Sequence, residues 1–167
     1  MKKEHTTSLR GSQMVRKDHP EICFRGLLDD AIAGVCFGAA LAHAEGKQNL
    51  ECGLKDITCA LMNIMGAHVC EKEPQPWSML GRDMETLHEM SHNPTKYFST
   101  TQFLPKPEQG PALAWLNVIR TQVRDAECAL IACYEDTDPP EGICRSLNRV
   151  SSAVFVLMCE ENSQFVY

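Results

Sequence analysis

The chain has 167 residues, enough for one domain with a single core that buries about two thirds of its unfolded surface. Its net charge of -6 argues against a nucleic-acid-binding protein, because binding a phosphate backbone requires an excess of Lys and Arg across one face. The polar residues 1–6 are unlike a signal peptide, and we expect no membrane span, no membrane partner and a cytoplasmic protein.

Polar segments and breaks divide the first half of the chain into expected elements. Residues 1–22 are polar and end in a His-Pro pair, which predicts an extended or loop-like, flexible leader before a single domain at 23–167. Apolar residues at helical spacing predict a first helix at about 24–45 and a second at about 49–69. A short amphipathic third helix is expected at about 81–91.

The second half contains a long break and two further helices. Residues 93–111 hold four prolines and three aromatic residues, and a loop of this length in a compact domain is commonly functional. A fourth helix is expected at about 112–134 and a fifth at about 141–160. No alternating β pattern is evident, so the sequence predicts an all-α bundle of five helices, four long and one short.

The chain has nine cysteines but no C-x-x-C pair. Most of them fall within the helical patterns, so we expect reduced core residues rather than disulfides or zinc ligands. His88 and His92 lie four residues apart on the third helix. We interpret them as solvated or capping residues rather than a metal-binding pair, and we predict no metal site.

The fourth helix carries a polar row beside its apolar face. A helix turns about 100° per residue, so the members of the row fall within an arc of roughly 80°. These members are Asn117, Arg120, Arg124 and Glu127. Guanidinium groups at the edge of an apolar face are partly desolvated and bind polyanions through forked hydrogen bonds. The row therefore predicts a phosphate-binding wall.

Two other helices carry matching polar residues. On the fifth helix one polar stripe contains Arg145, Asn148, Arg149 and Ser152. On the first helix, Arg25 lies one turn before Asp29, a spacing suited to an ion pair, and a carboxylate there is placed to orient an arginine of the fourth helix. The alternative is a set of surface salt bridges, each worth roughly 0 to 1 kcal/mol.

Several motifs occur together along the chain. LNVIRTQVRDAE at 116–127 and LNRVSS at 147–152 form a pair of helical motifs. Further motifs are TSLRG at 7–11, MVRK at 14–17, FRGLLD at 24–29, LHEMSHNP at 87–94 and LP at 104–105. In this order they cover nearly the whole chain and resemble the ATP:cob(I)alamin adenosyltransferases of the PduO and EutT type, the EutT branch most closely.

The resemblance implies a helical bundle that assembles as a homotrimer, with active sites between neighbouring subunits. The implied reaction transfers the 5'-deoxyadenosyl group of ATP, bound with Mg²⁺, to cob(I)alamin, which makes adenosylcobalamin and releases triphosphate. Cobalt(I) is itself a strong nucleophile, so the protein positions C5' and neutralises charge on the leaving group. The EutT branch further implies ethanolamine utilisation, with a corrinoid reductase as a candidate partner and a bacterial microcompartment as a candidate location.

The same resemblance assigns roles to individual residues. The catalytic set is Arg120, Arg124, Glu127 and Asp29, with Asp30 as the alternative to Asp29. The ATP-binding set is Thr6, Thr7, Arg10, Gly11, Lys17, Arg25 and Asn148. The corrinoid-binding candidates are Phe103, Tyr97 and Phe98, as an apolar wall below the ring that excludes water. The alternatives are a frayed leader and loop aromatics packed onto the bundle; alignment on the LP motif places Gln102 where the PduO branch has its phenylalanine.

Two features of the family are missing from the sequence. The chain has no segment like the cysteine-rich metal motif of many EutT proteins, and none like the Gly-Asp-rich nucleotide loop of the PduO branch. A metal-independent variant and a fragment of a longer product are the two explanations. Two rival functions are a non-catalytic corrinoid-binding or scaffolding bundle derived from this family, and a di-iron bundle, for which only Glu85 and His88 have the required spacing.

Overall fold

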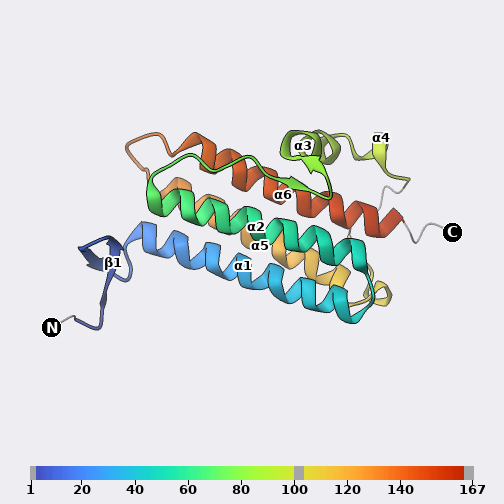
Figure 1. Ribbon diagram of the computed structural model, residues 1–167, viewed down its shortest axis with the longest axis horizontal. Helices are drawn as coiled ribbons and strands as arrows, with labels where there is room; N and C mark the ends of the chain where they lie inside the picture. The colour runs from blue at the N-terminus through green and yellow to red at the C-terminus, as the bar shows by residue number, and fades with distance from the viewer. Residues whose placement is uncertain (1–2, 100–103, 164–167) are drawn as a thin grey trace.

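Four long helices form a bundle in the computed structural model, which describes residues 3–99 and 104–163. They are α1 (Pro20–Ala44), α2 (Gln48–Cys70), α5 (Pro111–Ala132) and α6 (Glu141–Ser163). Figure 1 shows them side by side, with α1 packed on α2 and α5, and α6 packed on α2 and α5. The all-α fold predicted from the sequence is confirmed.

Shorter elements lie around this bundle. They are β1 (Thr6–Arg10), β2 (Gln13–Arg16), β3 (Ser78–Met79), β4 (Arg82–Asp83), α3 (Met84–His92), α4 (Pro94–Tyr97) and the 3₁₀ turn η1 (Pro107–Gln109). The strands form two antiparallel hairpins, β1 with β2 and β3 with β4. Helix α3 packs on the outer side of α6 (Figure 1).

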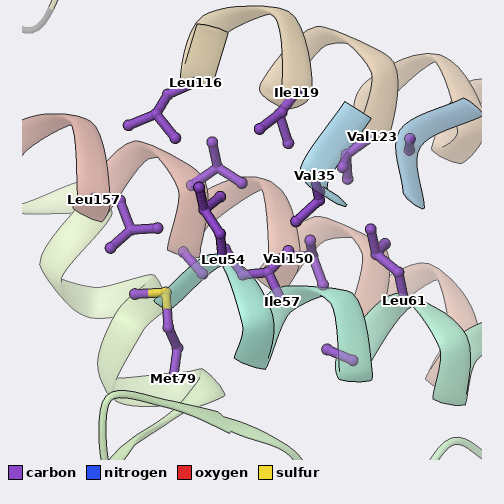
Figure 2. Close-up of a cluster of buried hydrophobic side chains, with 14 of the residues drawn as sticks. Val35, Leu54, Ile57, Leu61, Met79, Leu116, Ile119, Val123, Val150 and Leu157 are labelled. Atoms are coloured by element: carbon purple, nitrogen blue, oxygen red, sulfur yellow. The ribbon is translucent and has the colours of Figure 1, made fainter. Parts of the chain in front are cut away.

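The apolar stripes of the four long helices meet in one core. Figure 2 shows Val35 of α1, Leu54 of α2, Ile119 of α5 and Val150 of α6 converging, and Met79 of β3 closes one side. All five side chains are fully buried. The 3.6-residue periodicity of each helix therefore places its polar row at the edge of this core.

Helices α1 and α5 approach each other closely at two glycines of α1. A Cβ at Gly34 would lie 2.2 Å from Oε1 of Gln122, and one at Gly38 would lie 2.9 Å from Cδ1 of Ile119. Trp115 donates its indole N–H to the carbonyl of Gly34 at 2.8 Å. These contacts fix the rotation of α5 about its axis, and with it the direction in which its arginine row faces.

The leader differs from its expected structure. Residues 6–16 form the β1–β2 hairpin rather than an extended loop, and Gly11 supplies the positive φ of +52° at the turn. Helix α1 then begins at Pro20, where the missing N–H of proline costs nothing. The alternating pattern of these two strands was not recognised in the sequence because each strand is at most five residues long.

The cysteines also differ from expectation. All nine are free, but Cys159 alone is buried, and Cys133 and Cys144 are partly buried. The other six are exposed: Cys23, Cys36, Cys52, Cys59, Cys70 and Cys128. The expectation of core residues is wrong for these six, because they fall on the outward faces of their helices.

Helix α1 is apolar enough to satisfy the length and hydropathy criteria for a membrane span, with a mean hydropathy of 1.4 over 18 residues. The expectation that no segment is long and apolar enough for a membrane span does not hold for this window. One third of that window is buried in the bundle, where α1 packs on α2 and α5. Central helices of globular bundles meet the same criteria.

The core packing gives a direct stability prediction. Leu54→Ala should lower the free energy of unfolding by about 2 to 5 kcal/mol, because it leaves a cavity between α2 and its neighbours. Met62→Ala, on the same helix but 60% exposed, should change it by less than about 0.5 kcal/mol. Urea denaturation followed by circular dichroism measures both. Equal losses would contradict the position of the core.

Candidate anion-binding site at α3, α5 and α6

A pocket of about 270 Å³ opens where α3, α5 and α6 meet. Helix α5 contributes Arg120 and Arg124, and α6 contributes Asn148. The sequence predicted Arg120 and Arg124 as part of a phosphate-binding wall, and the family resemblance assigned Asn148 to ATP. The structure places the three around one pocket. The remaining lining residues are Ser91, His92, Ser151, Ser152 and Phe155.

The two arginines of the pocket have no acidic partner among the described residues. Nε of Arg120 donates to Oδ1 of Asn117 at 3.2 Å, a neutral acceptor within the predicted row. Four other arginines each pair with a carboxylate: Arg10, Arg16, Arg82 and Arg149. In a chain of net charge -6, two neighbouring guanidinium groups left without counter-ions indicate an anion site.

Asn148 is held at the pocket by contacts at both ends of its amide. Nδ2 donates to Oε1 of Glu127 at 3.5 Å, and Oδ1 accepts from Nη1 of Arg149 at 3.0 Å. Glu127 does not line the pocket itself. Within one chain, Glu127 therefore orients Asn148 from outside the pocket, while the arginines of the same row line the pocket.

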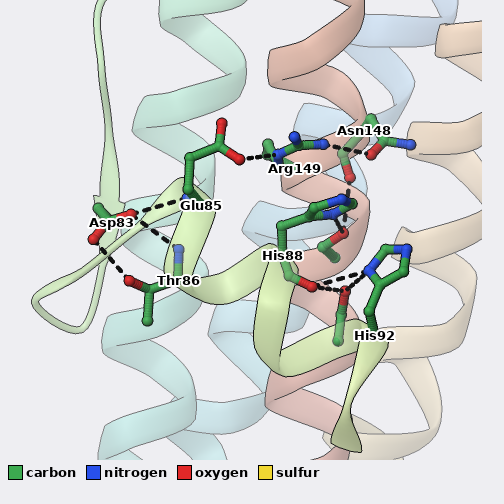
Figure 3. A network of polar contacts seen from close by, with 9 residues as sticks. Asp83, Glu85, Thr86, His88, His92, Asn148 and Arg149 are labelled. Atoms are coloured by element: carbon green, nitrogen blue, oxygen red, sulfur yellow. Dashed lines mark hydrogen bonds and ion pairs between the residues drawn. The ribbon is translucent and has the colours of Figure 1, made fainter.

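Helix α3 is fixed to α6 by polar contacts at successive turns (Figure 3). Asp83 caps the helix by accepting from the backbone N–H groups of Glu85 and Thr86. Nε of Arg149 then donates to Glu85 at 2.9 Å, and Nδ1 of His88 lies 3.1 Å from Oγ of Ser152. The end of α3 is thereby positioned against the pocket.

The ring of His88 is neutral at pH 7. Burial lowers its pKa below the ordinary value for histidine, and the positive charge of Arg149 lowers it further. A neutral ring suits its contact with the hydroxyl of Ser152, which itself donates to the backbone carbonyl of Asn148 at 3.2 Å. His88 therefore supports the wall of the pocket.

A larger pocket of about 820 Å³ is lined by residues of α2, α3, α4 and α6. Tyr97 and Phe98, both predicted corrinoid contacts, line it together with Met90 and Leu157. Tyr97 also donates its hydroxyl to Glu89. The third predicted contact, Phe103, lies outside the described residues.

The predicted nucleotide-binding leader lies at the end of the bundle where α1 begins (Figure 1). Thr6, Thr7 and Arg10 belong to β1, Gly11 is in the hairpin turn, and Lys17 donates its backbone N–H to His5. Arg10 and Tyr134 line a common pocket at the end of α5. Tyr134 is ten residues beyond Arg124, about 15 Å along a helix axis, so one chain does not bring its leader to its own arginine pocket.

Arg25 anchors this leader. Nη1 donates to the carbonyl of Leu9 at 2.7 Å, and Nε donates to Nδ1 of His68 at 3.3 Å. The ion pair between Arg25 and Asp29 suggested by their spacing is not formed, because the guanidinium turns toward the hairpin. Arg10 completes the cluster by pairing with Glu21.

The first-helix carboxylates do not contact the arginine row within one chain. Asp30 accepts from Nε2 of Gln122 at 2.9 Å, so its partner on α5 is an amide. Asp29 is exposed. The pairing of Asp29 with an arginine of a neighbouring subunit stays a prediction. Across residues 3–99 and 104–163, no group of three His, Cys, Asp or Glu side chains is placed to hold a metal ion.

Sequence reasoning did not assign Ser91, His92 and Ser151 to the site. His92 was recognised only as half of a histidine pair, whose rings are in fact 4.1 Å apart. His92 reaches the site because it lies at the end of α3 and α3 packs on α6. That packing is a tertiary contact, which the sequence pattern of α3 does not reveal. Ser152 was detectable, because it lies one turn after Asn148.

Comparison with known proteins identifies the family of this chain. The sequence profile of the family described as Cobalamin adenosyltransferase matches residues 1–161. The chain belongs to this family. The corrinoid adenosyltransferases EutT of Salmonella typhimurium LT2 and Escherichia coli K12 are each 32% identical to it over 162 residues, covering 94% of this chain. The chain spans 58% of the length of these relatives.

The fold of this family member is also shared with a solved structure. A variant of the PduO-type ATP:co(I)rrinoid adenosyltransferase from Lactobacillus reuteri, complexed with ATP, superposes with a TM-score of 0.70. The match covers 95% of this chain and 89% of that one, at 20% identity. This similarity shows that the two proteins share one fold.

The contact of Arg25 with His68, which anchors the leader, predicts that the stability of the protein depends on pH. Burial, followed by the charge of Arg25, lowers the pKa of His68 to about 4. The unfolded chain therefore binds more protons than the folded one between about pH 6.5 and 4, and stability falls as the pH falls through this window. Between pH 7 and 5 the loss should be about 2 kcal/mol.

The His68→Gln variant isolates this effect. Its stability should fall less than that of the wild type between pH 7 and 5, as measured by urea denaturation at each pH. His5→Gln changes an exposed histidine that has no side-chain contact in the described residues, and it should retain the wild-type pH dependence. Parallel pH profiles for wild type and His68→Gln would show that His68 is not buried as a neutral ring.

Proposed function

We propose that this chain is an ATP:cob(I)alamin adenosyltransferase that makes adenosylcobalamin for ethanolamine utilisation. The observation that carries the proposal is the pair of arginines, Arg120 and Arg124, which line one pocket with Asn148 and have no carboxylate partner within residues 3–99 and 104–163. The family membership and the two EutT relatives, named corrinoid adenosyltransferases, supply the substrate class.

The charges of the pocket suit the leaving group of this reaction. Cobalt(I) attacks C5' of ATP, a cobalt–carbon bond forms, the C5'–O bond breaks and its electron pair leaves on triphosphate. Negative charge therefore grows on the triphosphate oxygen, and Arg120 and Arg124 stabilise it through hydrogen bonds that are strongest in the transition state. Magnesium arrives as the counter-ion of ATP, so the site needs no protein cage of carboxylates for it.

The two pockets take part of their lining from the same two helices, α3 and α6. Phe155 lines the arginine pocket and Leu157 lines the larger one, two residues further along α6. On α3, Met90 lines the larger pocket and Ser91 the arginine pocket. We assign the corrinoid to the larger pocket, where Tyr97 contributes to an aromatic wall that excludes water from the metal.

The complete site lies between subunits of a homotrimer in this proposal. The leader of one chain is about 15 Å along α5 from the arginines of the same chain, so the leader that covers the nucleotide comes from a neighbour. Apolar side chains exposed on α1 and α5 support such an interface. They are Leu27, Phe37, Val118 and Ile131.

Replacement of either pocket arginine should slow transfer strongly without unfolding the chain. Arg120→Ala and Arg124→Ala should each lower kcat/KM about 100-fold, because one charged donor to the leaving group is lost. An anaerobic assay with ATP and chemically reduced cobalamin measures the light-sensitive product and the triphosphate. Arg145→Ala, an exposed arginine outside the pocket, is the matched control. Wild-type turnover in both pocket variants would refute the assignment, and corrinoid binding without transfer by the wild type would favour a scaffolding role.

Subunit complementation tests the shared site. One inactive chain carries Arg120→Ala and Arg124→Ala, and a second carries Thr6→Ala, Thr7→Ala and Lys17→Ala in the leader. Co-assembly of equal amounts should restore about a quarter of wild-type activity, because intact leaders then meet intact arginines on neighbouring chains. An inactive mixture that has exchanged subunits would place leader and arginines of the same chain in one site.

A further inference from the structure

His92 lies on the rim of the arginine pocket, in a position that the role of the arginines does not explain. It is the last residue of α3, and it lines the pocket with Arg120 and Arg124 of α5. Two contacts hold α3 in place on α6: Arg149 with Glu85, and His88 with Ser152 (Figure 3). Leu87 and Met90, on the inner face of the helix, are buried as well. The ring is therefore presented by a fixed element.

The hydrogen bonds of the ring define which nitrogen is available. Nδ1 of His92 lies 3.0 Å from the carbonyl oxygen of His88 (Figure 3). A carbonyl oxygen only accepts, so Nδ1 carries a proton and donates. The Ser91 hydroxyl donates to the same carbonyl at 2.7 Å and lies 3.2 Å from Nδ1, which is consistent with this orientation. Nε2 is left without a hydrogen-bond partner in residues 3–99 and 104–163.

The charges near the ring are mainly positive. Arg120 and Arg124 of α5 share the pocket with it, and the neutral ring of His88 on α3 touches it edge to face. The charges of Arg149 on α6 and Glu85 on α3 neutralise each other in an ion pair. The pocket wall from α6 contributes neutral side chains, those of Asn148, Ser151, Ser152 and Phe155. A polyanion that enters the pocket therefore meets the two guanidinium groups and the Nε2 edge of the His92 ring together.

We propose that His92 is the third cationic contact of the polyphosphate, donating from Nε2 to a phosphate oxygen and taking up a proton from solvent as the polyanion binds. This rests on the proposed function, because it places the triphosphate between Arg120 and Arg124. It adds a ligand contact from α3 to a site otherwise built from α5, α6 and a leader. The proton bound with triphosphate offsets part of the negative charge that the leaving group carries.

Isothermal titration of the assembled protein with inorganic triphosphate tests the proposal. His92→Ala should weaken binding about 10-fold at pH 7. His92→Asn keeps a donor for the His88 carbonyl but has no titratable group, so it should also weaken binding. Titrations in two buffers of different ionisation enthalpy count the protons taken up on binding. Both variants should take up fewer protons than the wild type. The comparison with the wild type corrects for the protons that triphosphate itself exchanges. His43→Ala, an exposed histidine of α1, should match the wild type in both measurements.

The arginine variants separate the two possible failures. If Arg124→Ala weakens triphosphate binding while His92→Ala binds it with wild-type affinity and proton uptake, the role of His92 is overturned and the arginine pocket stands. If neither variant weakens binding, the pocket itself is wrong and both proposals fall. Circular dichroism and thermal unfolding confirm that each variant is folded, as expected for an exposed residue at the end of a helix.

Discussion

The absence of counter-ions for Arg120 and Arg124 within the described chain is the constraint on which the account depends. Like-charged groups on adjacent helical turns repel each other, and nearby carboxylates would remove this cost, as they do for Arg82 and Arg149. Here the neighbouring Glu127 instead accepts from Asn148. The arginines are therefore left for an external anion, and the binding free energy of that anion compensates for their repulsion.

The rest of the bundle keeps these two side chains in position. The close contact of α1 with α5 at Gly34 fixes the rotation of α5, so that the apolar stripe faces the core and the row faces α6. Ion pairing and capping then attach α3 to α6, which closes one side of the pocket. A preorganised pocket of this kind stabilises a transition state without reorganisation during the reaction. The larger pocket, also lined by α3 and α6, provides space for a second, bulkier substrate.

The helical parts of this structure could be predicted from the sequence, because burial follows the helical period and helix ends are marked by Pro, Gly and polar caps. The row of Arg120 and Arg124 on α5 was predictable for the same reason, whereas the assignment of Asn148 on α6 to the nucleotide followed from the family resemblance. The β1–β2 hairpin was not, since strands of four or five residues give too little alternation. The place of His92 in the site was not predictable either, because it depends on how α3 docks on α6. The six exposed cysteines were wrongly expected on the inward faces of their helices.

A crystal structure of the protein with ATP and magnesium tests the central claim most directly. The account predicts triphosphate oxygens within hydrogen-bonding distance of the guanidinium groups of both Arg120 and Arg124, with the leader of a neighbouring subunit over the nucleotide. Triphosphate bound elsewhere, with both guanidinium groups directed into solvent, would contradict it.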